Sequence, residues 1–213
     1  MKSLSAEPEQ CIYIVDDDEA LRDSLVWLLE SSGYRAEAFA SADAFLKMFS
    51  AELMGCLLLD VRMPGMSGLE LFEELQRRHC ALPVIFITGH GDVPMAVSAL
   101  KKGAVDFIEK PFGDRDMLAL IEESLAGERL GRERRLLEAM TSRRLAGLTQ
   151  REREVLDLII SGKLNKQIAD VLGISIKTVE VHRARVMEKM EVSSLAELVQ
   201  SVLSIDAGTD GRY

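Results

Sequence analysis

In the first half of this chain, acidic, hydroxyl and ammonium side chains stand just after four of the five apolar runs. They are, in chain order, Asp16, Asp17 and Asp18 after CIYIV, Asp60 after GCLLL, Thr88 after PVIFI and Lys110 after AVDFI. Clustered carboxylates repel one another unless a cation neutralises them. An all-oxygen site with few protein ligands suits Mg²⁺, which keeps several waters and shares itself with a phosphoryl group. These residue types therefore predict chemistry on a phosphoryl group.

The roles of these residues follow from their chemistry. Asp60, alone after its run, is placed to act as a nucleophile on an incoming phosphoryl group. Lys110 could pair with one phosphoryl oxygen, and the Thr88 hydroxyl could donate to another. Each residue also has an ordinary explanation, since a lone lysine is usually solvated and Asp18 could simply cap the next helix. The presence of suitable residues after four core strands favours a phosphoryl site over these explanations.

These side chains can meet only if the apolar runs form one sheet. The runs read as short strands over residues 11–15, 34–39, 55–59, 83–87 and 104–108. Helix-like stretches begin near Glu19, Ser41, Ser67 and Pro94, and a fifth follows Phe112. Five such β-α units predict a parallel sheet with helices on both faces. Ligands bind outside the carboxyl ends of the strands in such sheets, which is where the polar residues are expected to converge.

The pattern becomes helical throughout after about Asp114. Residues 114–146 scatter leucines among charged residues, which predicts that the last helix of the first half runs on into a helical linker, interrupted or kinked near Gly127 and Gly131. A continuous coiled coil is an alternative, but the heptad pattern is irregular. Four helix-sized segments with short connections then follow, at residues 148–162, 165–173, 175–190 and 194–203.

Ala169, Gly173 and Val179 have the spacing of a helix-turn-helix. Ala169 lets two helices approach closely, Gly173 permits the positive φ of a sharp turn, and Val179 packs the second helix onto the first. Ser175 is expected to be the N-cap of that second helix. Its inward-facing residues are expected to be Ile176, Val179, Val186 and Met190. The spacing alone is a weak indication, because many helical hairpins show it.

The charge of the chain is divided unevenly. Of the net charge of −9, residues 1–123 contribute −11, from 11 Lys and Arg against 22 Asp and Glu. Residues 141–213 contribute +1, from 11 basic against 10 acidic residues. Such an asymmetry indicates two domains, of which the second is slightly basic.

Composition and targeting features exclude several classes of protein. A hydrophobic share of 47% excludes a mostly disordered chain. No apolar run approaches the roughly 20 residues that span a bilayer, and the polar N-terminus does not resemble a signal peptide. Cys11, Cys56 and Cys80 have no metal-ligand spacing and read as reduced core thiols. A cytoplasmic protein that does not bind membranes is therefore expected.

Four segments of the first half, taken together, resemble the receiver domain of two-component response regulators. They are VDDDEALR (15–22), LLDVRMPGMSG (58–68), FITGHGD (86–92) and AVDFIEKPF (104–112). The resemblance implies a flavodoxin/CheY-like fold in which a sensor histidine kinase phosphorylates Asp60. It implies that Asp16 and Asp17 form an acid pair, and that Asp17, Asp60 and the backbone carbonyl of Arg62 hold Mg²⁺ or Mn²⁺.

The same resemblance assigns the remaining receiver residues. Thr88 and Lys110 would contact the phosphoryl group, and Thr88 and Phe107 would act as switch residues. Phe107 could equally be a plain core phenylalanine. The Lys110–Pro111 bond would be a cis peptide, a conformation open mainly to X-Pro bonds.

Three segments of the second half resemble the LuxR-type output domain, with four helices and a helix-turn-helix at about 165–184. They are LTQREREVL (148–156), NKQIADVLGIS (165–175) and KTVEVHRARVMEKM (177–190). With the receiver, the whole chain resembles the FixJ branch of the NarL/FixJ family. The domains implied are a tail (1–10), a receiver (11–123), a helical linker (124–145), the DNA-binding domain (146–205) and a second tail (206–213).

Family members place the second helix of the motif in the major groove. The expected DNA contacts are Lys177, Arg185 and Lys189 to phosphates, Thr178 and His182 to the backbone, and Glu180 and Val181 to bases. His182 could equally be a surface histidine, and Glu180 could simply face water. With a net charge near +1, one copy is expected to bind weakly and a dimer usefully.

The function expected from both resemblances is regulation of transcription. Phosphorylation of Asp60 would shift the receiver toward a state that dimerises through the helix from Pro94 to Lys102 and the adjacent strand. Expected partners are the sensor histidine kinase, promoter DNA, a second copy of the chain and, for an activator, RNA polymerase.

Two other classes of protein remain as alternatives. A phosphatase with an aspartyl-phosphate intermediate also needs clustered aspartates, Mg²⁺, Thr and Lys, but it usually carries its nucleophile after the first strand. A pure interaction protein would use the C-terminal helices to bind a protein instead of DNA.

Overall fold

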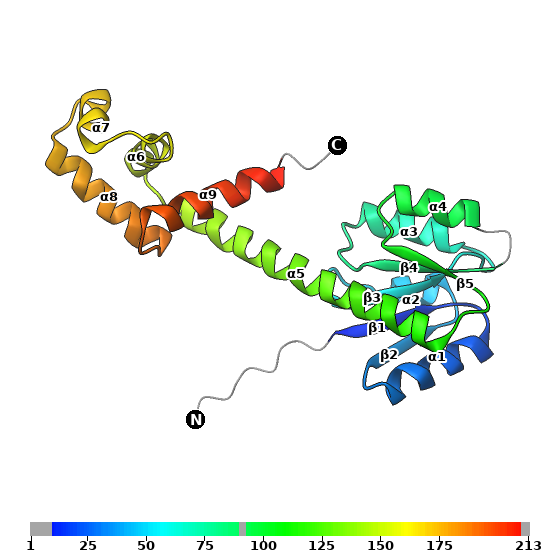
Figure 1. The fold of residues 1–213 in the computed structure, drawn as a ribbon. Helices are drawn as coiled ribbons and strands as arrows, with labels where there is room; N and C mark the ends of the chain where they lie inside the picture. Colours follow the sequence, from blue (N-terminus) through cyan, green and yellow to red (C-terminus); the bar gives the residue numbers. More distant parts are fainter. Residues whose placement is uncertain (1–9, 90–92, 210–213) are drawn as a thin grey trace. The chain divides into compact units, whose positions relative to one another are not determined.

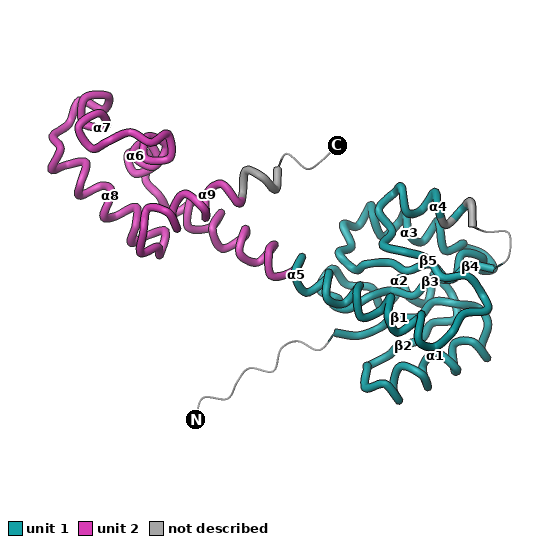
Figure 2. Tube along the Cα trace, viewed as in Figure 1, with its two compact units in different colours: residues 1–131 teal, residues 132–213 magenta. Residues whose placement is uncertain are grey.

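The computed structural model describes residues 10–89 and 93–209, without the side chains of residues 93, 94, 96 and 205–209. The chain divides into two compact units, residues 1–131 and residues 132–213 (Figure 2). Nearly all of the expected N-terminal tail, and the last four residues of the expected C-terminal tail, lie outside the described residues.

The first unit is built on a five-stranded parallel sheet (Figure 1). Its strands are β1 (Cys11–Val15), β2 (Arg35–Phe39), β3 (Gly55–Asp60), β4 (Val84–Thr88) and β5 (Asp106–Glu109). They lie in the order β2-β1-β3-β4-β5. The near-continuous apolar runs of β1, β3 and β4 are buried along their whole length, as expected for strands covered on both faces. The predicted parallel sheet is confirmed.

Helices cover both faces of this sheet (Figure 1). They are α1 (Glu19–Ser31), α2 (Ala42–Met48), α3 (Gly68–Arg77), α4 (Val93–Lys101) and α5 (Asp114–Ala146). On one face, buried residues of α1 and α5, among them Leu29 and Ile121, pack against apolar side chains of the sheet. On the other face, the cluster includes Phe45 of α2, Phe72 of α3 and Ala99 of α4.

Local sequence determines where several of these helices begin. The Asp18 carboxylate caps α1 by accepting from the amides of Ala20 and Leu21 at 3.0 and 3.3 Å, so its capping role is confirmed. Ser67 and Glu70 form a capping box at the start of α3. A Cβ atom at Gly68 would lie 2.0 Å from the backbone oxygen of Asp60. Glycine is therefore required for α3 to begin against the end of β3.

The helix α5 runs on into the linker as expected, and it continues from Asp114 to Ala146 without a break. The predicted interruption near Gly127 and Gly131 is wrong. A helical glycine is less favourable than alanine by only about 1 kcal/mol, so neighbouring contacts can offset it. Gln10 supplies such contacts, since its Nε2 donates to the backbone oxygen of Leu125 at 3.0 Å and to the Glu128 carboxylate at 2.5 Å.

The second unit contains the end of α5 and four further helices. They are α6 (Gln150–Ile160), α7 (Asn165–Leu172), α8 (Ile176–Met190) and α9 (Leu195–Thr209). Their core includes Val155, Leu156, Ile168, Val186 and Leu198. The four predicted helices are confirmed, although α9 continues beyond its predicted end at residue 203.

The helix-turn-helix geometry is also as predicted. Gly173 adopts φ +65° in the turn, and the Ser175 hydroxyl accepts from the Thr178 amide at 3.1 Å. Val179 is fully buried. One residue of the predicted inward line departs from the prediction, because Ile176 is 46% exposed. The reason is its place in the first turn of α8, where no helix covers it fully.

Candidate phosphoryl-transfer site and nucleic-acid interface

The ammonium of Lys110 joins the carboxylates of Asp16 and Asp60. Its Nζ lies 2.9 Å from Asp16 Oδ2 and 2.6 Å from Asp60 Oδ1. Asp16 is fully buried and Asp60 is 6% exposed. The register of β1 with β3 pairs Val15 with Leu59, which brings the next residues, Asp16 and Asp60, together. Residues 94 and 50 positions apart in the sequence thus meet at the carboxyl edge of the sheet.

Opposing influences act on the pKa of the buried Asp60 carboxyl and on that of Lys110. Burial raises the pKa of the Asp60 carboxyl, while the hydrogen bond from Lys110 lowers it and the nearby Asp16 charge raises it. The amide of Arg62 donates to Asp60 Oδ2 at 2.7 Å and opposes the rise in this pKa. Burial lowers the pKa of Lys110, but its hydrogen bonds to Asp60 and Asp16 outweigh burial, so this pKa is raised. Lys110 therefore remains a cation.

The hydroxyl of Thr88 lies at the end of β4 without a partner. Thr88 is fully buried, and its Oγ1 has no hydrogen-bond partner among residues 10–89 and 93–209. An unsatisfied buried hydroxyl disfavours folding by about 1–3 kcal/mol. This hydroxyl could donate a hydrogen bond to a group that binds at the site, such as a phosphoryl oxygen.

Asp16 and Asp17 differ in their surroundings. Asp16 accepts from the Asp18 amide at 2.8 Å, and its backbone oxygen accepts from Arg22 Nη1 at 2.8 Å. Asp17 is exposed and makes no side-chain hydrogen bond or ion pair with the described residues. Sequence reasoning missed Arg22, although a basic residue one turn into the helix after an acidic run was an available indication.

The donor set fits a Mg²⁺ ion that keeps most of its waters. Within the described part of the chain, no three His, Cys, Asp or Glu side chains form a metal site by themselves. A magnesium site of receiver type needs fewer, because Mg²⁺ usually takes one or two carboxylates and retains water. Asp17 offers a free carboxylate, Asp60 a second and Arg62 a backbone carbonyl. Asp16 is held mainly by Lys110.

The predicted switch and dimer region contains exposed apolar side chains. Phe107 is half-buried against the cluster on the α3–α4 face of the sheet. Met95 and Val97 of α4 and Val105 beside β5 are 37–47% exposed. The Lys110–Pro111 bond is cis, as predicted. The switch role of Phe107 stays a prediction.

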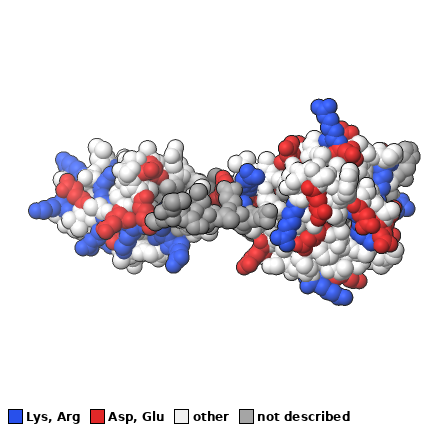
Figure 3. Space-filling view, turned by 90° about the horizontal axis from the view of Figure 1, so that it is seen from below, with Lys and Arg blue, Asp and Glu red and all other residues white. Residues whose placement is uncertain are grey.

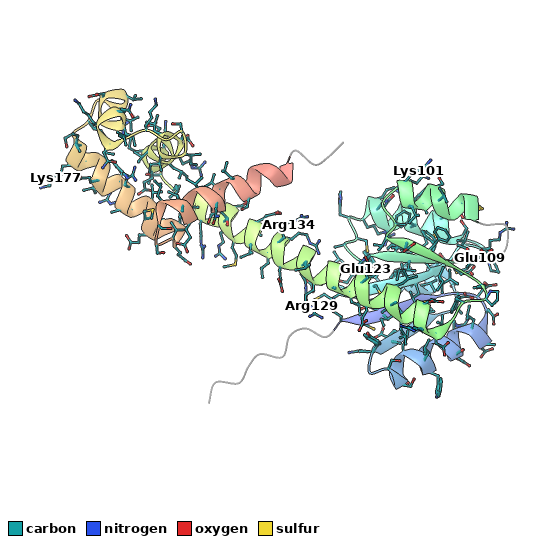
Figure 4. All side chains as sticks on the ribbon, in the orientation of Figure 1. Lys101, Glu109, Glu123, Arg129, Arg134 and Lys177 are labelled. Atoms are coloured by element: carbon teal, nitrogen blue, oxygen red, sulfur yellow. The ribbon has the colours of Figure 1, made fainter. Side chains whose placement is uncertain are left out.

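Several predicted DNA-contacting residues lie on the outer face of α8. Lys177, in its first turn, is exposed (Figure 4), as are Glu180, Val181 and Arg185. The Thr178 hydroxyl already pairs with that of Ser175 at 2.8 Å. His182 is half-buried, and its Nδ1 lacks a partner among the described residues. Only its Nε2 could therefore face a DNA backbone.

Lys189, another predicted DNA-contacting residue, is paired within the protein. Its Nζ donates to Glu152 Oε2 at 2.7 Å and to the backbone oxygen of Gly147 at 3.3 Å. Glu152 is 3% exposed, and its hydrogen bonds to Lys189 and to the Thr149 amide lower its pKa to about 2. The Lys189 ammonium thus joins α8 to the start of α6, and a phosphate contact by Lys189, which stays a prediction, would have to replace its bond to Glu152.

Charges of both signs are mixed on the surface. In Figure 3, basic and acidic atoms alternate on the visible face of each unit. Cys11 and Cys56 are buried thiols and Cys80 is half-buried, and none of the three is in a disulfide, as expected for core thiols. No helix in the described residues is both long enough and apolar enough to cross a membrane.

Each half of the chain matches a known protein family. The family described as "Response regulator receiver domain" matches residues 12–122. The family described as "Bacterial regulatory proteins, luxR family" matches residues 146–202. The chain is 49% identical to the transcriptional regulatory protein FixJ of Azorhizobium caulinodans, covering 90% of this chain and 91% of that protein.

Two further similarities extend over almost the whole chain. The response regulator protein TmoT of Ectopseudomonas mendocina is 45% identical, covering 91% of this chain and 88% of that protein. The solved structure of the response regulator StyR is 45% identical and superposes with a TM-score of 0.83, covering 92% of this chain and 98% of that one. Relatives of this kind are transcriptional regulators, which excludes the phosphatase alternative. The chain therefore belongs to the two-component response regulators of the NarL/FixJ family, with a receiver followed by a LuxR-type DNA-binding domain.

Proposed function

We propose that a sensor histidine kinase phosphorylates Asp60, and that this modification promotes dimerisation and promoter binding. The observation that carries the proposal is the contact of Lys110 with both Asp16 and Asp60, beside the Thr88 hydroxyl, which has no partner in the described part of the chain. A buried carboxylate next to a fixed cation and a free donor can accept a phosphoryl group whose oxygens those two groups then bind.

The proposed transfer is a displacement at phosphorus. An oxygen of Asp60 attacks the phosphorus atom of the kinase's phosphohistidine, and the phosphorus–nitrogen bond breaks. The imidazole leaves with the bonding electron pair and takes a proton from water. In the resulting acyl phosphate, Lys110 pairs with one oxygen and Thr88 donates to another, which removes the unsatisfied hydroxyl. Because Thr88 must turn toward the phosphoryl group, Phe107 can move into the space beside it.

Asp17, Asp60 and the backbone carbonyl of Arg62 are proposed to hold Mg²⁺ or Mn²⁺, with Asp16 completing the acidic cluster. When bound, the ion supplies positive charge that neutralises the oxygens of the phosphoryl group. Arg22 holds the backbone of Asp16 and so keeps the preceding acidic loop in place.

Dimerisation is proposed to use the surface formed by α4 and β5. Met95, Val97 and Val105 are exposed apolar residues of this surface, and a second copy would cover them. Two DNA-binding domains would then bind two half-sites at once. Binding of the second domain becomes intramolecular, which compensates for the weak DNA affinity expected of one domain with a net charge near +1. The proposed contacts are Lys177, Thr178, Glu180, Val181, His182 and Arg185. RNA polymerase would be a partner if the chain activates transcription.

The proposal is tested by size-exclusion chromatography with light scattering of the full chain. Beryllium fluoride with Mg²⁺ mimics an aspartyl phosphate, and we expect it to convert monomer to dimer. Asp60→Ala should abolish this conversion. Glu152→Gln is the matched control, because it changes a buried carboxylate of the other domain and should leave the conversion intact. An unchanged mass in the wild type, or an equal change in Asp60→Ala, would contradict the proposal.

A further inference from the structure

The linker part of α5 presents a row of large apolar side chains to solvent. Leu130, Leu136, Leu137 and Met140 are 44–68% exposed. No residue from 130 to 140 is buried, so the rest of the described chain leaves this part of the helix largely uncovered. Contiguous exposed apolar surface marks a site of interaction in a soluble protein.

The row follows the spacing of a coiled coil. Residues three or four apart share one side of an α-helix, and alternating spacings of four and three give the heptad pattern of paired helices. Five residues of α5 are connected by such spacings, and Leu136 flanks them. We call them the linker stripe: Ala126, Leu130, Glu133, Leu137 and Met140. The pattern ends at the charged residues Glu123 and Arg144, so the stripe is about two heptads long.

The two sides of this part of α5 differ in chemistry. The side away from the stripe carries Arg132, Arg135 and Ser142. A helix that is merely solvated is polar all round, whereas a helix that pairs with another has one apolar side and one polar side. The linker is of the second kind, and its apolar side lies open in the described chain.

The charge within the linker stripe indicates which partner fits it. Glu133 makes no side-chain hydrogen bond or ion pair with the described residues. In a parallel pair of helices in register, a residue at its position enters a hole whose four residues include the one that follows it in sequence. That residue of the facing copy is Arg134. Each Glu133 would therefore meet the Arg134 of the other copy, which forms two symmetric ion pairs.

Arg134 is available for such a pair. Its side chain is 76% exposed, stands on the open part of α5 (Figure 4) and meets only Glu138 of its own chain, at 3.5 Å. A second copy thus supplies both an apolar row for the four apolar residues of the stripe and a cation for its one acid. An isolated polar residue in a coiled-coil seam also fixes the register of the two helices.

We propose that the linker stripes of two copies pack together as a short parallel coiled coil in the dimer. This inference rests on the proposed dimerisation upon phosphorylation. In that dimer both linkers lead from paired receivers to DNA-binding domains on one operator, which is a parallel arrangement. Two heptads are too short to hold two free chains together. Contact between the receivers makes the pairing intramolecular, so that a weak seam adds to the strength of the dimer.

The first test exchanges the charges of the proposed ion pairs in the full chain. Glu133→Arg alone sets arginines against arginines across the seam, and Arg134→Glu alone sets glutamates against glutamates. With beryllium fluoride and Mg²⁺ at low salt, we expect each variant to dimerise about fivefold more weakly than wild type. An equal mixture of the two variants should recover the dimer, because both ion pairs are restored only between unlike copies. Size-exclusion chromatography with light scattering over a dilution series measures this.

The second test removes part of the apolar seam. Leu137→Gln keeps a good helix former on an exposed position, so it should leave thermal unfolding of the unactivated chain unchanged. It should weaken the activated dimer about tenfold, because two leucines no longer leave water. Val171→Gln is the matched control, since it replaces an exposed apolar residue of α7 and should leave the dimer as strong as that of the wild type.

The outcomes separate this inference from the proposed function. Activated wild type that stays monomeric would overturn both. A wild-type dimer that neither Leu137→Gln nor the charge variants weaken would overturn the linker stripe alone. Weakened charge variants whose mixture does not recover would overturn the parallel pairing. Destabilisation of the unactivated chain by Leu137→Gln would show that the stripe is covered within one chain, and would overturn the second copy as its partner.

Discussion

The receiver and the DNA-binding domain each contain a lysine paired with a buried carboxylate, and the two pairs differ in what surrounds them. Lys110 bridges two carboxylates, Asp16 and Asp60, beside a threonine hydroxyl without a partner in the described residues. Lys189 binds Glu152 and a backbone oxygen, and Glu152 also accepts from the Thr149 amide at 2.8 Å. The first group thus contains a buried hydroxyl without a partner among the described residues, whereas the second contains no such buried side-chain atom there.

The protonation of the two carboxyls follows this difference. Burial is the largest influence on Asp60 and raises its pKa. Hydrogen bonds are the largest influence on Glu152 and lower its pKa to about 2. A buried carboxylate with an unsatisfied hydroxyl beside it is prepared for a ligand, whereas the ion pair of Glu152 with Lys189 joins α8 to the start of α6. The sequence predicted the place of Lys110 at the edge of the sheet but gave no indication that Lys189 binds Glu152.

The largest expected effect concerns reactivity. Asp60→Asn should abolish phosphoryl incorporation from acetyl phosphate, because the amide nitrogen and oxygen cannot replace the carboxylate nucleophile. Glu152→Gln should incorporate the phosphoryl group at the wild-type rate. Intact-protein mass spectrometry measures both. Equal incorporation in Asp60→Asn and wild type would remove the distinction between the two pairs.

The next effect is on stability, and it should distinguish Lys110 from Lys189 by whether Mg²⁺ restores what their replacement loses. Lys189→Met should lower the free energy of unfolding of the DNA-binding domain by about 2–4 kcal/mol, because it leaves a buried carboxylate without its cation. Lys110→Met should destabilise the receiver similarly, but millimolar Mg²⁺ should restore part of the loss, since an ion that binds only the folded state stabilises it. Thermal unfolding with and without Mg²⁺ measures this. Rescue of Lys189→Met as well would contradict the comparison.

The two carboxyls should also give opposite dependences on pH. Glu152, with its pKa lowered from 4.5 to about 2, contributes stability above pH 4.5 that is lost as pH falls toward 2. Asp60, with its pKa raised from 3.8, favours the folded receiver below pH 3.8, and this contribution is lost as pH rises through the folded value. Hydrogen exchange resolved by peptide, compared with Glu152→Gln and Asp60→Asn, should show the two trends in separate domains. Parallel trends in both domains would count against it.

The smallest expected effect concerns Thr149, the N-cap of α6, whose amide also donates to Glu152. Thr149→Ala removes the N-cap of α6 and should lower stability by about 1 kcal/mol, while Thr149→Ser should retain most of it. Denaturant unfolding measures the difference. A loss as large as that of Lys189→Met would mean that the cap, and not the lysine, holds Glu152.

Much of the fold could be predicted because its signals are local. Strands buried on both faces give near-continuous apolar runs, and caps such as Asp18 and Ser175 lie next to the helices that they begin. The turn of the helix-turn-helix needs positive φ, and Gly173 supplies it. The convergence of Asp16, Asp60, Thr88 and Lys110 was predictable because the carboxyl ends of parallel strands share one edge.

Other features escaped prediction because they depend on distant residues or on small energies. The contact between Lys189 and Glu152 joins positions 37 apart, and nothing near Lys189 in the sequence indicates it. The reach of Arg22 to the backbone of Asp16 needs the particular path of the loop between them. The continuity of α5 through two glycines was decided by a balance of about 1 kcal/mol per glycine against packing.

The amino-acid sequence by itself determined the α/β and all-helical halves, the identity of the residues at the strand ends and the helix-turn-helix turn. These depend on periodicity, capping and backbone sterics within a few residues. Only the tertiary structure decided that Lys110 bridges two carboxylates and that Lys189 binds Glu152 and a backbone oxygen. Pairing energies of charges depend on burial and on neighbours that the fold brings from elsewhere in the chain.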